Sequence, residues 1–243
     1  MAVFGDLGRV PITIKSLSLG IKYWQNVASG TTPNKLLSYA YKSDMQRLHT
    51  SPWLQNIQSI LLENGLGEFW NNPNIHNIYQ ITRTRLQDQF IQRWFESIEN
   101  SISLHTLGIL KEVYAPSKYL SSVKSVNVRR IITKLRLNFG LLNYSRLNGV
   151  NDRTCTLCDM NVNEDITHFL CVCPKYADER HFFKQKLAGT IPLFNSSSHE
   201  LQVKTLLNLD LSAFRLAGNI SPDEVTKDII SFLKTIVNSR NAS

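Results

Sequence analysis

The chain has 243 residues, of which 42% are hydrophobic and 19% charged, and its formal net charge at neutral pH is +8. This composition is typical of a globular protein with one or two packed domains, and it excludes disordered, collagen-like and low-complexity chains. The sequence has no run of about 18 uncharged apolar residues, so we expect neither a membrane-spanning helix nor a membrane partner. Asp6 and Arg9 lie near the start of the sequence, so we also expect no secretory signal peptide.

Helical periodicity dominates the first part of the chain. Apolar residues recur at spacings of three and four, and no segment alternates polar and apolar residues for long enough to predict a sheet. The pairs Thr32–Pro33 and Ser51–Pro52 predict helix starts, and Asn64–Gly65 predicts a helix end. We expect helices over 11–27, 33–49, 52–63, 75–98 and 103–114. The tryptophans are interpreted as core residues rather than as a base-stacking surface: Trp24, Trp53, Trp70 and Trp94.

The positive charge is concentrated in one segment. Residues 118–153 contain eight basic side chains and one acidic side chain, whereas 1–117 sums to +2 and 154–243 to −1. Apolar residues at helical spacing predict an amphipathic helix over 126–143 with its basic side chains facing outward. Clustered positive charge is expected of a nucleic-acid-binding surface, and the alternative is a solvated helix face without a partner. The candidate nucleic-acid-binding residues are Lys124, Arg129, Arg130, Lys134, Arg136, Arg146 and Arg153.

A cluster of cysteine and histidine residues follows the basic segment. Cys155, Cys158, His168 and Cys173 form the pattern C-x2-C-x9-H-x4-C. Two thiols separated by two residues can bind one ion from a tight turn, and an imidazole and a third thiol complete a tetrahedral site. Because protein ligands fill all four positions, we predict a structural zinc ion, Zn(2+), rather than a catalytic one. The alternative is a coincidental group of buried thiols and a surface histidine. The remaining cysteine, Cys171, is interpreted as a small buried hydrophobic residue.

Helices are expected again after this cluster, over 176–187, over 200–207 and from the cap at Ser221 onward. The predicted fold class is therefore mainly α: a helical array with a small zinc knuckle inserted between helices. The change of charge near Pro116 predicts two regions, 1–115 and 116–243. Cysteines in a chain of this kind are expected to be thiols or metal ligands, which favours an intracellular protein, in the nucleus or the cytoplasm.

The cysteine cluster and its surroundings resemble a known family. The matching motifs are Cys155-x2-Cys158, His168-Phe169-Leu170, Cys173-Pro174-x-Tyr176 and Arg180. They resemble the zinc-binding C-terminal region of reverse transcriptases from non-long-terminal-repeat retrotransposons, the jockey-like elements in particular. Residues 3–12 and 22–24 are similar to the stretch that follows the polymerase domain in these proteins, and 136–144 is similar to their run into the zinc knuckle. The resemblance implies a segment downstream of the polymerase that helps to hold template RNA or target DNA, with the parent element's polymerase domain as a further partner.

We expect no enzymatic activity in this chain. A reverse transcriptase holds two metal ions with a pair of adjacent aspartates and a third carboxylate, and this set is missing from the sequence. The tetrapeptide at 176–179 looks superficially like the polymerase motif, but it lies on a predicted helix and has no upstream aspartate partner. The expected function is a non-catalytic, zinc-stabilised nucleic-acid-binding segment. The alternatives are a zinc-stabilised helical protein-interaction module and a non-functional remnant of a retroelement.

Overall fold

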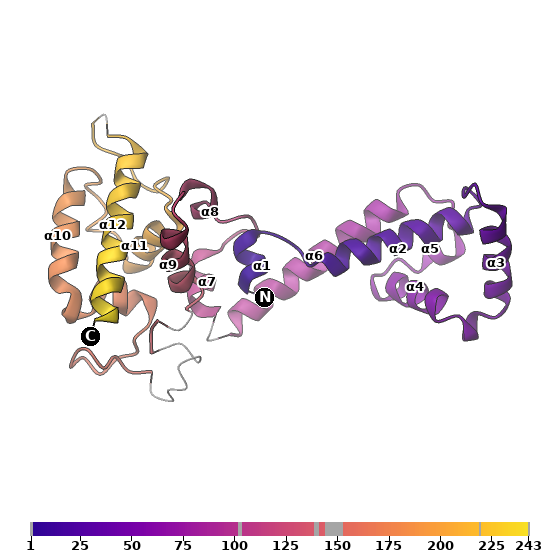
Figure 1. The fold of residues 1–243 in the computed structure, drawn as a ribbon, viewed down its shortest axis with the longest axis horizontal. Helices are drawn as coiled ribbons and strands as arrows, with labels where there is room; N and C mark the ends of the chain where they lie inside the picture. Colours follow the sequence, from indigo (N-terminus) through magenta and orange to yellow (C-terminus); the bar gives the residue numbers. More distant parts are fainter. Residues whose placement is uncertain (1, 102–103, 139–140, 144–152, 219, 243) are drawn as a thin grey trace. The chain divides into compact units, whose positions relative to one another are not determined.

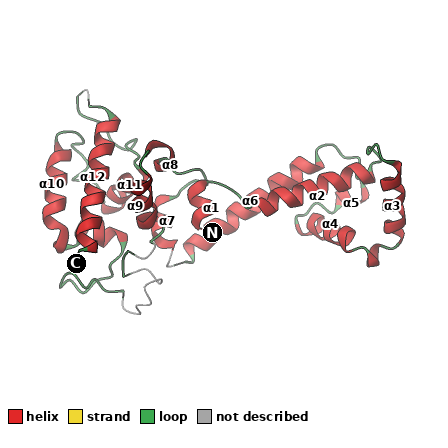
Figure 2. Ribbon diagram, viewed as in Figure 1, coloured by secondary structure: helices red, strands yellow, loops and turns green. Residues whose placement is uncertain are grey.

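The computed structural model describes residues 2–101, 104–138, 141–143, 153–218 and 220–242. Over these residues helices are the only regular secondary structure (Figures 1 and 2), apart from one isolated antiparallel bridge between Thr154 and Asn163. The prediction of a mainly α fold is thus confirmed. None of the described helices combines the length and the apolarity that a membrane span requires.

The chain divides into two compact units, each with its own hydrophobic core. The N-terminal unit comprises Val10–Trp94, and the C-terminal unit combines Met1–Arg9 with Phe95–Ser243. The boundary predicted between 115 and 116 falls inside the C-terminal unit. The reason is that the first residues of the chain hydrogen-bond to the segment around Ser117, so the change in charge does not coincide with a change of packing unit.

The N-terminal unit is built around buried indole rings. Its elements are α2 (Ile12–Ala28), α3 (Lys35–Gln46), the 3-10 helix η1 (Leu48–Thr50), α4 (Pro52–Glu63), α5 (Glu68–Asn71) and α6 (Ile78–Glu99), which continues beyond this unit. Trp24 is fully buried, and its ring lies parallel to that of Trp70 with the centroids 5.5 Å apart. Trp94 is also fully buried, and Trp53 packs against the core in a partly buried position. The interpretation of the tryptophans as core residues is confirmed.

Local sequence sets the ends of these helices. Asn34 caps α3, because its side chain accepts a hydrogen bond from the backbone N–H of Leu36. This cap replaces the predicted one at Thr32, so α3 is shorter than predicted. The start of α4 at Pro52 is confirmed. The chain leaves α4 at Gly65, whose φ of +67° is a conformation that glycine adopts without strain.

The C-terminal unit has one continuous core that includes the cysteine-rich segment. Its elements are α1 (Ala2–Leu7), α7 (His105–Leu110), α8 (Tyr119–Ser122), α9 (Val126–Arg136), the π-helix η4 (His168–Val172), the 3-10 helix η5 (Pro174–Tyr176), α10 (Ala177–Ala188), α11 (His199–Asn208) and α12 (Pro222–Asn241). α10 and α12 lie side by side (Figure 1), and the stacked rings of Phe183 and Phe232, 4.3 Å apart, join them. The segment from Cys155 to Cys173 therefore contributes to the core of the C-terminal unit.

The basic helix is shorter than predicted. α9 ends at Arg136, and Asn138 takes a positive φ of +50°, so the helix predicted over 126–143 is wrong at 137–138 and 141–143, whereas 139–140 lie outside the described residues. Asparagine is one of the few residues that enter the left-handed region at low cost, and periodicity alone does not reveal where it does so. The apolar face of the helix, which includes Val128 and Ile132, is buried as predicted.

A buried ion pair joins α1 to α9. Arg136 is fully buried, and its Nε and Nη2 donate to Asp6 Oδ1 at 2.9 and 2.8 Å. The hydroxyl groups of Ser117 and Tyr119 also donate to the Asp6 carboxylate, and Arg136 Nη1 donates to the carbonyl of Leu207 at 2.9 Å. The prediction that Arg136 contacts nucleic acid is therefore wrong, because the side chain is enclosed by groups from α1, α8 and α11 that helical periodicity does not reveal.

Candidate metal centre

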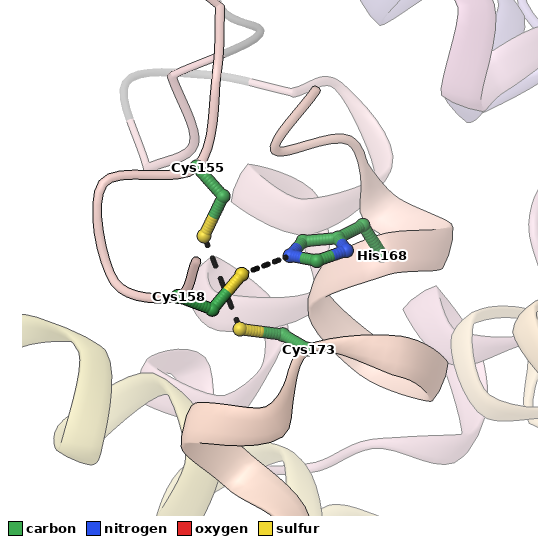
Figure 3. Close-up of side chains that lie close together, drawn as sticks. All are labelled: Cys155, Cys158, His168 and Cys173. Atoms are coloured by element: carbon green, nitrogen blue, oxygen red, sulfur yellow. Dashed lines mark hydrogen bonds between the residues drawn. The ribbon is translucent and has the colours of Figure 1, made fainter. Parts of the chain in front are cut away.

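Four side chains converge at one point of the C-terminal unit. The ligand atoms of Cys155, Cys158, His168 and Cys173 all lie within 4.8 Å of one another, and Figure 3 shows the side chains pointing toward a common centre. Cys155 Sγ lies 3.9 Å from Cys173 Sγ, and Cys158 Sγ lies 3.5 Å from His168 Nε2. None of the three cysteines of this group forms a disulfide, and neither does Cys171. The fold thus brings the predicted ligands together in an arrangement that could hold one metal ion.

A short hairpin-like loop presents the first two cysteines. The backbone N–H of Cys155 donates to the carbonyl of Val162, and that of Glu164 donates to the carbonyl of Arg153, both at 2.8 Å. Directly before Val162, Asn161 takes a positive φ of +54°, which helps to reverse the chain direction. The loop therefore turns back on itself within a few residues and leads directly into the segment that carries the histidine.

A π-turn sets the distance between the histidine and the last cysteine. The backbone N–H of Cys173 donates to the carbonyl of His168 at 2.7 Å, which is the i+5 to i pattern of a π-helix. Asp165 caps the start of this turn by accepting from the N–H of His168 at 2.7 Å. Arg180 donates to the carbonyls of Val172 and Cys173 at its end. His168 and Cys173 are five positions apart. In an α-helix of 3.6 residues per turn their side chains would point to different sides, so their convergence depends on the wider π-turn.

The candidate site is largely closed to water. Cys155, His168 and Cys173 are 4%, 5% and 1% exposed, and Cys158 is half-buried. Burial raises the pKa of the Cys155 thiol and raises the pKa of the Cys173 thiol to about 12, whereas it lowers the pKa of His168. The imidazole is therefore neutral at physiological pH, as a metal ligand must be, and the thiols of Cys155 and Cys173 need a nearby cation in order to ionise. His168 Nδ1 has no hydrogen-bond partner among the described residues.

An ion pair attaches the loop to the last helix. Glu164 is 1% exposed and accepts from Arg240 Nε at 2.8 Å and from Arg240 Nη2 at 3.1 Å. It also accepts from the backbone N–H of Asn143 at 2.8 Å, and the Asn143 side chain donates to the carbonyl of Thr154 at 2.9 Å. Sequence reasoning missed this pair, because Glu164 and Arg240 are 76 positions apart and no local pattern connects them.

The remaining cysteine lies outside the cluster. Cys171 is 8% exposed, and its Sγ lies 4.0 Å from the carbonyl oxygen of His199. Burial raises the pKa of its thiol to about 11, so the group stays neutral at physiological pH. The interpretation of Cys171 as a small buried residue is confirmed.

The predicted nucleic-acid-binding residues differ in their exposure. Arg129 is half-buried, with Nη1 3.5 Å from the carbonyl oxygen of Leu120. Arg153 is half-buried as well, and Arg146 lies outside the described residues. The exposed members of the set are Lys124, Arg130 and Lys134, which we name the basic α9 surface. Arg130 and Lys134 are four residues apart on α9 and therefore share one face of the helix.

Comparisons of this chain with models of protein families, with curated proteins and with solved structures find no match. Inference about its function therefore depends on the residues of the candidate site and of the surface.

Proposed function

We propose that this chain is a non-catalytic, zinc-stabilised nucleic-acid-binding segment of the kind that follows the polymerase domain in jockey-like retrotransposon reverse transcriptases. The observation that carries the proposal is the convergence of four ligand atoms from residues spaced as C-x2-C-x9-H-x4-C. The basic α9 surface belongs to the same unit and supplies positive charge for phosphate groups. Template RNA and target DNA are the partners that the family resemblance implies.

Two of the ligand-atom distances, within a set of four atoms that spans at most 4.8 Å, and the chemistry of the ligands are consistent with zinc. A tetrahedral zinc ion with bonds of about 2.3 Å to sulfur and 2.0 Å to nitrogen separates its ligand atoms by about 3.5 to 3.8 Å. The Sγ–Sγ distance of 3.9 Å and the Sγ–Nε2 distance of 3.5 Å are close to these values. Three thiols and an imidazole are soft donors that suit zinc rather than magnesium or calcium. Four protein ligands leave no position for a substrate water, so the ion has a structural role.

Metal binding would also organise the core of the C-terminal unit. The residues between the last two ligands include Phe169 and Leu170, which are 0% and 1% exposed. The ring of Phe169 packs edge-on against Tyr176, with the centroids 5.1 Å apart. Because the ligands hold this segment in place, the free energy of metal binding contributes directly to folding.

The metal content of the purified full chain tests the structural role. We expect one zinc ion per chain by elemental analysis, and we expect Cys158→Ala to lose both the ion and cooperative folding of the C-terminal unit. Cys171→Ala is the matched control and should retain its zinc, because this thiol lies outside the cluster. A wild-type chain that folds cooperatively without any metal would contradict the proposal.

The salt dependence of nucleic-acid affinity tests the binding role. Fluorescence anisotropy with short labelled RNA and DNA should show affinity that falls steeply with salt concentration. In Arg130→Ala/Lys134→Ala we expect the slope of log K against log salt to decrease by about 1.4 to 1.8, because each phosphate contact contributes about 0.7 to 0.9. Lys227→Ala/Lys234→Ala removes the same charge from exposed positions of α12 and should change the slope less. Equal slopes in the two double variants would contradict the assignment to α9.

One observation favours the alternative of a protein-interaction module. A groove of about 250 Å³ between α10 and α12 is lined by Phe182, Phe183 and Phe232, and Phe182 is 71% exposed. An exposed aromatic side chain beside an apolar groove is typical of protein-binding surfaces. A protein partner that binds independently of salt and is lost in Phe182→Ala, together with no nucleic-acid affinity, would favour this alternative.

A further inference from the structure

The N-terminal unit contains a polar groove between the C-terminal half of α2 and the segment that leads into α6. Its volume of about 440 Å³ is within the range of roughly 300 to 1,000 Å³ that is typical of small-ligand sites. No aspartate or glutamate is among its described lining residues, and Lys22 contributes a positive charge. Five carboxamide side chains line it: Gln25, Asn26, Asn74, Asn77 and Gln80.

The walls of this groove are held in place by the core of the unit. Gln25 Nε2 donates to the carbonyls of Pro73 and Ile75 at 3.2 and 2.9 Å, which fixes the segment before α6 against α2. Ile75 packs against the hydrophobic core, and Trp24, next to Gln25 in the chain, is fully buried. At the end of α2 the hydroxyl of Thr31 donates to the carbonyl of Asn26 at 3.1 Å. The groove is thus preformed, which lowers the entropic cost of binding a ligand.

The groove also combines a cation with an aromatic ring. Lys22 Nζ lies 5.5 Å from the centroid of the Tyr79 ring. Single-stranded nucleic acids are bound by aromatic rings on which bases stack and by cations that contact phosphates. Carboxamides both donate and accept hydrogen bonds, so they can pair with the edges of bases, and a lining without carboxylates does not repel a phosphate.

We propose that this groove binds a nucleotide of single-stranded RNA or DNA, with Tyr79 contacting the base, Lys22 the phosphate and the carboxamides the base edge. The inference rests on the proposed function only for its ligand class, since the groove lies in the other unit and shares no residue with the metal centre or with α9.

A second cavity extends the groove along α6. It shares Asn77 and Gln80 with the first cavity, also has a volume of about 440 Å³, and includes Arg85 in its lining. Asp88 is the acidic residue of this second lining, and it lies farther along α6 than the shared residues. Arg85 therefore offers a second cation to a strand that extends beyond the first cavity, and Asp88 lies one helical turn farther along α6.

Anisotropy titrations of labelled ten-nucleotide oligo-U RNA and oligo-dT DNA with the full chain test this inference. The titrations are made in the wild type and in the Arg130→Ala/Lys134→Ala background, which separates the groove from the basic α9 surface. We expect Tyr79→Ala to weaken binding about 10-fold, the effect of losing one stacked base. Tyr79→Phe should keep the wild-type affinity, because it retains the aromatic ring. We expect Lys22→Ala to decrease the salt slope by about 0.7, the value for one phosphate of a single strand.

Matched controls come from α3 of the same unit, where Tyr39 and Lys42 are exposed and lie outside the groove. Tyr39→Ala and Lys42→Ala should bind like the wild type, and circular dichroism is to be recorded for every variant to check that it is folded. If the groove variants bind as tightly as these controls while the α9 double variant binds weakly, the groove inference is overturned and the proposed function stands. Loss of affinity in the groove variants alone supports the groove and contradicts the α9 assignment. No affinity for either oligonucleotide, or binding independent of salt, overturns both.

Discussion

Replacement of Asp6 by alanine tests whether the buried pair with Arg136 holds α1 in the C-terminal unit. The Asp6 carboxylate accepts two hydrogen bonds from Arg136 and one each from the hydroxyls of Ser117 and Tyr119. The Arg136 side chain is 0% exposed and that of Asp6 is 5% exposed. In Asp6→Ala the guanidinium would remain buried with neutral acceptors only, which include the carbonyl of Leu207.

The cost of this change follows from the burial of the charge. Removing one partner of a buried ion pair typically destabilises a protein by about 3 to 5 kcal/mol, because the other charge is left uncompensated. This loss is a large part of the 5 to 15 kcal/mol by which domains are usually stable. Asp210→Ala is the matched control, because it removes an ion pair with Lys118 whose side chains are 34% and 65% exposed. An exposed pair of this kind contributes at most about 1 kcal/mol.

Urea unfolding followed by two probes measures the effect and locates it. All four tryptophans lie in the N-terminal unit, so their fluorescence reports on that unit, whereas far-ultraviolet circular dichroism reports on helices of both. We expect Asp6→Ala to move the transition seen by circular dichroism to a lower urea concentration and to leave the midpoint of the fluorescence transition unchanged. A loss below 1 kcal/mol, equal to that of Asp210→Ala, would refute the reasoning, because it would mean that Arg136 is solvated or finds another anion.

Three further predictions follow from the burial of single residues, and two of them compare a pair of positions. Tyr176 is fully buried and its hydroxyl has no hydrogen-bond partner among the described residues, so Tyr176→Phe should raise the free energy of unfolding by up to about 1 kcal/mol. Tyr119→Phe should lower it by about 1.5 to 3 kcal/mol, because the hydrogen bond to the Asp6 carboxylate is lost. Thermal unfolding compares the two variants. Gly8 and Gly30 both have positive φ, but a Cβ at Gly8 would overlap the backbone of Ala115 and Pro116, whereas a Cβ at Gly30 meets nothing. In urea unfolding, Gly30→Ala should lower the free energy of unfolding by about 1 kcal/mol, and Gly8→Ala should lower it clearly more. Cys171→Ser should cost about 1 to 3 kcal/mol by burying a hydroxyl, yet leave the metal content unchanged, and loss of metal would place this residue among the ligands.

The helices and the ligand set could be predicted from short-range patterns. The start of α4 follows from a proline at the first helical position, and its end from a glycine, so a few residues contain the whole signal. The ligands could be named because metal chemistry restricts both residue types and spacing. Even here the structure added the π-turn, because the spacing of His168 and Cys173 predicts a turn but not which hydrogen bond closes it.

Two features depend on contacts between residues that are far apart in the chain. Arg136 has the same local signature as Arg130, a basic residue on an amphipathic helix, and its burial follows from Asp6, which is 130 positions away. Arg240 likewise anchors Glu164, next to the loop that carries Cys155 and Cys158 of the candidate metal centre, from a position far along the chain. Sequence by itself therefore determined where most helices lie and which residues form the candidate metal centre, because these features depend on residues that are close in the chain. Only the tertiary structure decided which cations face water and which segments share a core, because burial of a charge is decided by the groups that pack around it.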